Sequence, residues 1–137
     1  MEAPYLTVVA PDRQVYPGTI RYEYRIAAGF RRRHANPPLW HDRHEHEFTV
    51  TLELAAFRPP TGLYGLDMVA LEEQLKRWTA AIPPVLNDCP LCPHGTTEEL
   101  CHYFASLPLE SHVQLLAVSV AESPERVTIL RLAHPDR

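Results

Sequence analysis

The sequence predicts an α+β fold in which an antiparallel sheet carries two helices on one face. Apolar and polar residues alternate in two stretches of the first half of the chain, two further stretches repeat apolar residues every three or four positions, and two strand-like stretches follow. The expected order is β-β-α-α-β-β. We expect one domain over residues 1–137, with residues 1–18 as a short N-terminal extension.

Period-two alternation predicts the first two strands. The first is expected from residue 19 to 26 and the second over 48–54, ending before the proline turn at 59–62. Between them we expect a loop of about fifteen residues, 31–45. Residues 4–10 are a candidate for an additional short strand. The alternating apolar residues are Ile20, Tyr22, Tyr24 and Ile26, then Phe48, Val50, Leu52 and Leu54.

Two amphipathic helices are expected next. Asp67 opens the first and Pro83-Pro84 ends it, while Thr96 with Glu99 three residues later is the capping-box pattern that opens the second, which ends near Pro108. Two further strands, 113–121 and 127–132, are separated by an expected hairpin loop over 122–125. The apolar helix positions are Leu71, Leu75, Trp78 and Ile82, then Leu100, Phe104 and Leu107.

The charge balance excludes several classes of function. There are 13 Lys and Arg against 17 Asp and Glu, a net charge of 13 − 17 = −4, and no run of like charge exceeds Arg31, Arg32 and Arg33, so no nucleic-acid partner is expected. No apolar run approaches the roughly 20 residues that span a bilayer, so no membrane role is expected. An odd number of cysteines and an N-terminus without a signal-peptide pattern predict a cytoplasmic location.

Histidines suggest a metal site. His44 and His46 are two residues apart at the start of a strand and therefore point to one face, although such a pair alone is also compatible with solvated or structural histidines. A catalytic zinc site takes three protein ligands, so a third group is needed. Cys89 and Cys92 are a second candidate, as half of a zinc knuckle or as a redox pair, and Cys101 is expected to be a small buried apolar residue instead.

Several short motifs occur in the order and spacing of one known family. The chain resembles the 6-pyruvoyltetrahydropterin synthase family, including the bacterial 6-carboxytetrahydropterin synthases, over residues 19–132. The resemblance implies the tunnelling fold, or T-fold, zinc, and self-association through sheet edges as a trimer or hexamer with active sites between subunits. The motifs are Ile26-Ala27-Ala28, His44-Glu45-His46, Leu86-Asn87-Asp88, Thr97-Glu98-Glu99 and Val120-Ala121-Glu122.

The chain departs from the family at its catalytic groups. His44 and His46 match two zinc ligands, but the first ligand position falls on Gly29, and the catalytic cysteine position falls on Trp40. The Asp-His dyad that precedes the Leu-Asn pair in the family is absent. His34 or His41 is the candidate third zinc ligand, and His41 is also placed to act as a general base near neutral pH.

The substrate-binding groups are better preserved. The resemblance matches Glu122 to the glutamate that binds the guanidine-like edge of a pterin, and it adds Thr97 and Glu99. A carboxylate accepts two parallel hydrogen bonds from an N–C–N edge. Helix capping is an equally good explanation of Thr97 and Glu99, together with Thr96, and solvation in the turn is the alternative for Glu122. The arginines at 31–33 either meet substrate phosphates or are solvated.

Three hypotheses for function follow. The first is a divergent lyase, isomerase or cyclase that acts on a pterin-like or other small cyclic metabolite in a specialised biosynthetic pathway, through His41, His44, His46 and Glu122. The second is a non-catalytic binding or scaffolding oligomer that has lost its chemistry. The third is that the family's synthase activity persists through relocated groups.

Overall fold

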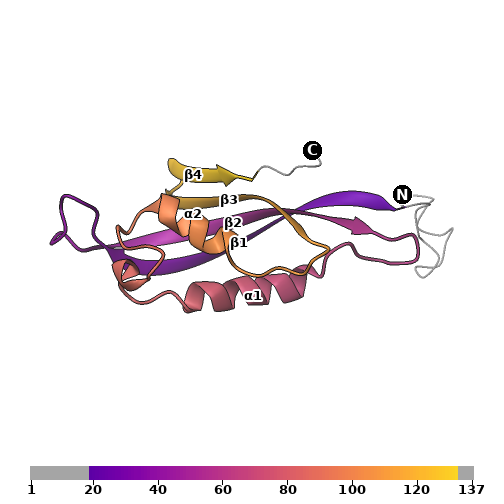
Figure 1. Cartoon of the computed structure of the whole chain (residues 1–137), viewed down its shortest axis with the longest axis horizontal. Coiled ribbons are helices and arrows are strands. Elements are labelled where there is room, and N and C mark those ends of the chain that lie inside the picture. The colour runs from indigo at the N-terminus through magenta and orange to yellow at the C-terminus, as the bar shows by residue number, and fades with distance from the viewer. Residues whose placement is uncertain (1–18, 133–137) are drawn as a thin grey trace, which may run out of the picture.

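Four antiparallel strands and two helices make up the computed structural model, which describes residues 19–132 (Figure 1). The sheet order is β1-β2-β3-β4, so each strand pairs with its neighbour in sequence. The T-fold class and the element order expected from the sequence are confirmed, while the strand expected over 4–10 lies outside the described residues. The strands are β1 Ile20–His34, β2 His44–Arg58, β3 Gln114–Ser123 and β4 Arg126–Arg131, and the helices are α1 Met68–Ala80 and α2 Thr97–Ala105 with the short 3₁₀ turn η3 Leu86–Asp88 between them.

The long β1–β2 ribbon differs from the expected one. Instead of a loop over 31–45, β1 continues to His34 and β2 begins at His44, so only residues 35–43 connect them. The register pairs His34 with His44 at one end and Ile20 with Arg58 at the other. The arginines at 31–33 interrupt the alternation of apolar and polar residues, so the pattern does not predict a strand there. The backbone pairing of β1 with β2 nevertheless continues through them.

The arginines alternate across the sheet. Arg31 pairs with Glu45 and Glu47 across the strand, at 3.9 and 3.7 Å. Arg32 points to the opposite face, where its guanidinium donates to the carbonyl oxygens of Thr79 and Ile82 at 2.7 and 3.1 Å. Arg32 therefore provides hydrogen-bond donors for carbonyl groups at the C-terminal end of α1. The sequence predicted instead that the arginines either meet substrate phosphates or are solvated.

Both helices cover one face of the sheet. Inward residues of β1 and β2, among them Phe48, Leu52 and Leu54, are almost completely buried, whereas their neighbours on the other face are mostly exposed. Asp67 caps α1 by accepting a hydrogen bond from the Ala70 amide, as the sequence predicts. The predicted capping box of Thr96 and Glu99 at the start of α2 is also present.

The final hairpin is tighter than expected. Only residues 124–125 form the turn, so Glu122 and Ser123 belong to β3. The β3–β4 register shifts between Ala121 and Ser123, which leaves Glu122 without a paired residue in the ladder. Such a bulge re-aims a side chain at the end of a strand. None of the helices in the described part of the chain is long and apolar enough to cross a membrane.

Candidate metal centre

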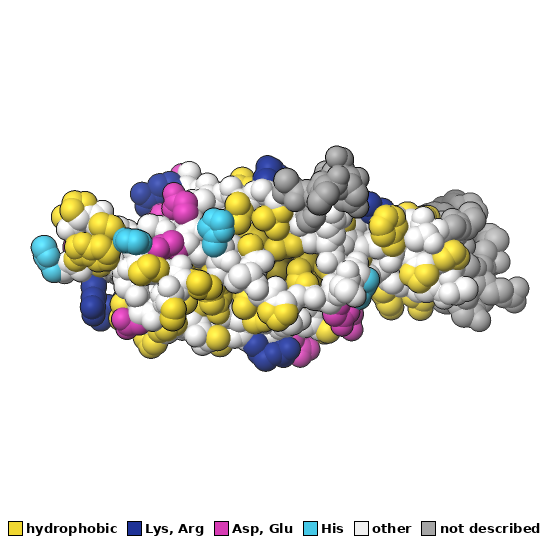
Figure 2. All heavy atoms as spheres, viewed as in Figure 1, with side chains coloured by type: hydrophobic (Ala, Val, Ile, Leu, Met, Phe, Trp, Pro, Cys, Tyr) yellow, Lys and Arg dark blue, Asp and Glu magenta, His cyan; other side chains and the backbone are white. Residues whose placement is uncertain are grey.

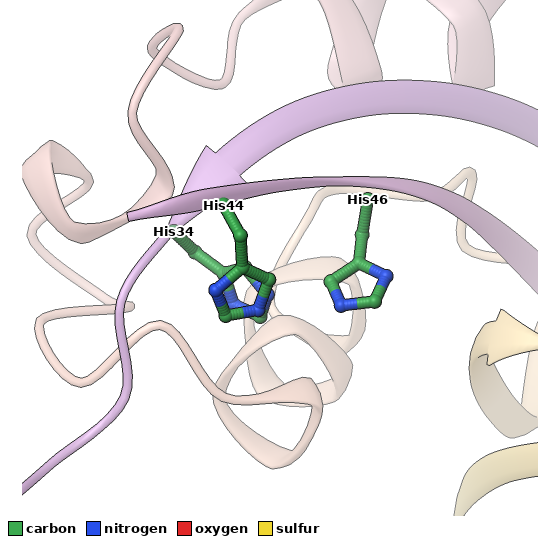
Figure 3. Close-up of side chains that lie close together, drawn as sticks. All are labelled: His34, His44 and His46. Atoms are coloured by element: carbon green, nitrogen blue, oxygen red, sulfur yellow. The ribbon is translucent and has the colours of Figure 1, made fainter. Parts of the chain in front are cut away.

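Three imidazoles converge on the inward face of the β1–β2 ribbon (Figure 3). One ligand nitrogen from each of His34, His44 and His46 lies within 4.8 Å of the other two. The centroids of the three rings are 4.6 to 5.1 Å apart. The strand register explains the cluster, because His34 lies directly opposite His44, and His46 follows two residues later on the same face.

His34 is the most constrained of the three. Its side chain is 2% exposed, and its Nδ1 lies 2.7 Å from the carbonyl oxygen of Gly95. Because a carbonyl only accepts, Nδ1 carries the proton and donates it, which leaves the lone pair of Nε2 available in the neutral ring. Nε2 is buried and has no hydrogen-bond partner among the described residues.

Burial lowers the pKa of His34, because the charged ring would be poorly solvated. The hydrogen bond to Gly95 opposes this effect, His44 and His46 lower the pKa further, and Glu122 raises it slightly. The net result favours the neutral imidazole, which is the form that binds metals. An unpartnered buried acceptor costs about 1–3 kcal/mol, and a metal ion would satisfy it. The residues present therefore fit a zinc-type site.

The other two rings complete the donor set. Nδ1 of His44 lies 3.1 Å from the carbonyl oxygen of Asp42 and donates to it, which again leaves Nε2 available. Nε2 of His46 lies 3.8 Å from the Glu122 carboxylate, and both side chains are 25% exposed. Glu122 thus stands beside the histidines, on the partly open side of the cluster.

The structure corrects one expectation about the ligands. Gly29 lies opposite Thr49 on the outward face of the sheet, whereas His34 and Phe30 lie on the inward face. A side chain at position 29 would therefore point away from the cluster. The third imidazole comes from His34, so the position of Gly29 does not leave the donor set incomplete.

The remaining predicted residues are placed differently. His41 lies exposed in the loop over 35–43 and is not one of the three convergent imidazoles. Trp40 is 49% exposed in the same loop, with its ring 5.9 Å from that of His94. The hydroxyl of Thr97 is 2.7 Å from that of Thr128, a contact that ties α2 to β4.

Glu99 is held within its own capping box. Its carboxylate accepts hydrogen bonds from the amides of Thr96 and His94 and from the Thr96 hydroxyl, and it contacts the His94 ring. Burial alone would raise the pKa of Glu99, but these donors together lower it below the ordinary value of a glutamate. The capping interpretation of Glu99 therefore accounts for its contacts.

The lowered pKa of Glu99 predicts an acid-dependent contribution to stability. This contribution is complete above the ordinary carboxyl pKa and is lost as the pH falls through the lower pKa of the folded state. The Glu99→Gln variant keeps a hydrogen-bond acceptor but cannot titrate. As the pH falls below about 5, its free energy of unfolding should therefore decrease less steeply than that of the unmodified protein. Urea titrations of both proteins over that range measure the difference, and parallel curves would contradict it.

The cysteines belong to the core. Cys89, Cys92 and Cys101 are buried and free, and their sulfurs are absent from the group of convergent metal ligands found among residues 19–132. Burial raises the pKa of the Cys101 thiol to about 11, which keeps it protonated. The Cys101 expectation is confirmed, and its sulfur lies 3.7 Å from the carbonyl oxygens of Val118 and Thr128.

Two residues that position His34 were not among the predicted site residues, although Asn87 belongs to one of the motifs that carry the resemblance. Gly95 supplies the carbonyl that holds the ring and also accepts from the Asn36 amide at 2.9 Å. Asn87 bonds to both the amide and the carbonyl of Ala35, at 2.9 and 2.8 Å, and to the carbonyl of Pro93. Asn87 thereby joins the end of β1 to the loop that contains Gly95. The sequence signal that could have identified Gly95 is its place directly before Thr96, the residue that caps α2.

Gly95 should not tolerate a side chain. Its φ is +64°, and an added Cβ would lie 3.0 Å from the Ala35 carbonyl oxygen and 3.1 Å from the Asn87 amide. Gly95→Ala should therefore lose at least about 1–2 kcal/mol of stability. Gly29→Ala is the matched control, since its Cβ would meet only the Phe48 carbonyl oxygen at 3.7 Å. Chemical denaturation of both variants measures the difference, and equal stabilities would contradict the described loop conformation.

The fold and the site together define the class: a T-fold domain with a three-histidine donor set and an adjacent carboxylate. Among solved structures, 6-pyruvoyl tetrahydropterin synthase from Caenorhabditis elegans is similar, with a TM-score of 0.69 and 14% sequence identity over 83% of this chain and 97% of that one. At this identity the similarity shows a shared fold. No protein-family model matches the sequence, and no curated protein matches it.

Proposed function

We propose that the chain is a metal-dependent, 6-pyruvoyltetrahydropterin synthase-like enzyme that acts as a lyase, isomerase or cyclase on a pterin-like or other small cyclic metabolite. The observation that carries this proposal is the convergence of three imidazoles beside one carboxylate. The similar solved structure supports it, because that protein is a synthase of a tetrahydropterin on the same fold.

Each residue has a separate task in this proposal. His34, His44 and His46 would hold the metal, most suitably zinc given an all-imidazole donor set. Zinc held by these histidines would supply Lewis-acid chemistry toward a carbonyl group of the substrate. Glu122, held by the β3 bulge, accepts two hydrogen bonds from an N–C–N edge of the heterocycle. Its position next to His46 would bring the bound heterocycle beside the metal ligands.

Binding experiments separate the metal part of the proposal from the heterocycle part. Purified protein should contain zinc, and it should bind neopterin more tightly than the matching lumazine, which lacks the exocyclic amine. Glu122→Gln should weaken neopterin binding about 10- to 100-fold while leaving the metal content unchanged, since hydrogen bonds to a charged group contribute about 1.5–3 kcal/mol. Glu125→Gln, in the adjacent exposed turn, is the control for the loss of one negative charge.

A non-catalytic oligomer is the second candidate function. One observation favours it: Glu99 and the Thr97 hydroxyl, two of the three predicted substrate contacts, are engaged within the protein. Protein without metal or neopterin binding that still self-associates as a trimer or hexamer would support this alternative. Retained synthase activity would instead require turnover of dihydroneopterin triphosphate by the zinc-loaded protein.

A further inference from the structure

The Gly95 carbonyl oxygen accepts hydrogen bonds from two side chains at the end of β1. Nδ1 of His34 lies 2.7 Å from this oxygen, and the side-chain nitrogen of Asn36 lies 2.9 Å from it. A carbonyl oxygen has two lone pairs, so it accommodates both donors at once. The same Asn36 nitrogen also donates to the His94 carbonyl oxygen at 3.0 Å. Asn36 therefore fixes the direction of two successive carbonyl groups, one of which holds the metal ligand His34.

The local sequence explains why Asn36 reaches the same carbonyl as His34. The two residues are two positions apart, and side chains at this spacing in extended backbone point to one face. Pro37 disfavours helical backbone for the residue before it, which keeps the chain extended beyond the last residue of β1. Between the two residues, the amide and carbonyl of Ala35 are both hydrogen-bonded to the side chain of Asn87, at 2.9 and 2.8 Å.

The large apolar side chains of the hairpin loop contribute little to holding it in place. Leu39 and Trp40 are 57% and 49% exposed. Figure 2 shows hydrophobic side chains on the surface at the left end of the molecule, where Figure 1 places this loop. Side chains that remain this exposed gain little free energy from burial. The position of the Gly95 carbonyl relative to β1 therefore depends on hydrogen bonds, and those of Asn36 act on this carbonyl directly.

The Gly95 carbonyl determines which nitrogen of His34 carries the proton. While this carbonyl accepts from Nδ1, the lone pair of Nε2 is free for a metal ion. If the carbonyl turned away, the proton on Nδ1 would lose its partner in a side chain that is 2% exposed. The tautomer with the proton on Nε2 would then compete, and that tautomer has no lone pair on Nε2. Fixing the carbonyl therefore keeps the ring ready to bind a metal.

We propose that Asn36 is a positioning residue of the metal centre, which holds the Gly95 carbonyl so that His34 keeps the tautomer whose Nε2 binds the metal. This inference rests on the metal part of the proposed function, and it adds a residue that acts through Gly95 and His34 rather than on the metal itself. Partners that hydrogen-bond directly to a metal ligand typically affect metal affinity 10- to 100-fold. Asn36 acts one step further away, so its effect should be smaller.

The zinc affinity of Asn36→Leu, measured by competition with a chromophoric chelator, tests this proposal. Leucine is similar in size to asparagine but cannot donate a hydrogen bond. We expect zinc binding to be weaker by about 3- to 10-fold, less than the loss of a direct partner of a ligand would cause. Asn36→Gln keeps the amide donor and should recover most of the affinity. Asp67→Ala is the control, because it removes a side-chain hydrogen bond to the backbone outside the metal centre and should leave zinc affinity unchanged.

NMR spectra of the metal-free protein provide a second readout, which a merely structural role of Asn36 would not change. Two-bond ¹H–¹⁵N correlation spectra distinguish the two tautomers of a neutral imidazole, and they would be recorded at about pH 8, where histidine is neutral. We expect the unmodified protein to show His34 with the proton on Nδ1, and Asn36→Leu to show a mixture of tautomers. If the leucine variant fails to fold, Asn36→Ala tests the same loss of the donor.

The outcomes separate this inference from the proposed function. Unchanged zinc affinity in Asn36→Leu, with zinc bound by the unmodified protein, would overturn the role of Asn36 and leave the proposed function intact. A single Nδ1-protonated tautomer of His34 in both proteins would also overturn that role. An equal loss of affinity in Asp67→Ala would attribute the effect to lowered stability instead. Absence of zinc binding by the unmodified protein would overturn the proposed function, and with it any role of Asn36 toward a metal.

Discussion

His34→Gln is expected to abolish stoichiometric metal binding. The variant removes the one imidazole whose Nε2 is both buried and unpartnered among the described residues, leaving two ligands where a catalytic zinc site needs three. Removing a residue that only hydrogen-bonds to a metal ligand typically lowers metal affinity 10- to 100-fold. Removing a ligand itself should therefore lower the affinity by more than about 100-fold. The metal content, measured by elemental analysis after dialysis against a weak chelator, should fall from about one metal ion per chain to a small fraction of one.

Glutamine is chosen because its amide can still donate to the Gly95 carbonyl, so the end of β1 should keep its conformation. Circular dichroism spectra confirm that the variant is folded. His41→Gln is the matched control, since His41 lies exposed in the hairpin loop and should leave the metal content unchanged. The reverse pattern, in which His41→Gln loses the metal and His34→Gln keeps it, would show that the hairpin loop rearranges to supply the third ligand.

Local sequence signals predicted most of the fold. The caps at Asp67 and Thr96 depend on contacts within three residues, and the alternation around Phe48 depends on burial along one strand, so both are visible in the sequence. The continuation of β1 through the arginines was missed, because its cause is long-range. Arg32 is accommodated on the inward face only because the C-terminal end of α1, 47 residues away, accepts its hydrogen bonds.

The candidate site was predictable to a similar extent. The spacing of His44 and His46 places both on one face, but the choice between His34 and His41 required the strand register, which the hydrophobic pattern does not specify in this polar segment. The resemblance placed the first ligand at Gly29, an odd number of residues from His34 and hence on the other face. The hydrogen bond from His34 to the Gly95 carbonyl spans 61 residues. The glycine before the helix cap is visible in the sequence, but its pairing with His34 is not.

Phe48→Ala should destabilise the protein more than any other single truncation proposed above, by about 3–5 kcal/mol. Phe48 is 0% exposed, and its ring lies 5.4 Å from that of Phe30 and 5.3 Å from that of His34. The alanine would leave a cavity beneath the histidines as well as in the core. Since a typical domain is stable by about 5–15 kcal/mol, a large part of the total should be lost.

Phe57→Ala is the matched control for Phe48→Ala, because it makes the same change in the same strand at a position that is 57% exposed, on the opposite face. It should cost less than about 0.5 kcal/mol if the position is free of other contacts. Urea denaturation of the two variants gives both values, and Phe48→Leu provides a milder truncation should the alanine variant fail to fold. Similar losses at positions 48 and 57 would mean that the outward face of β2 is also covered in solution, as it would be if subunits associate through this sheet.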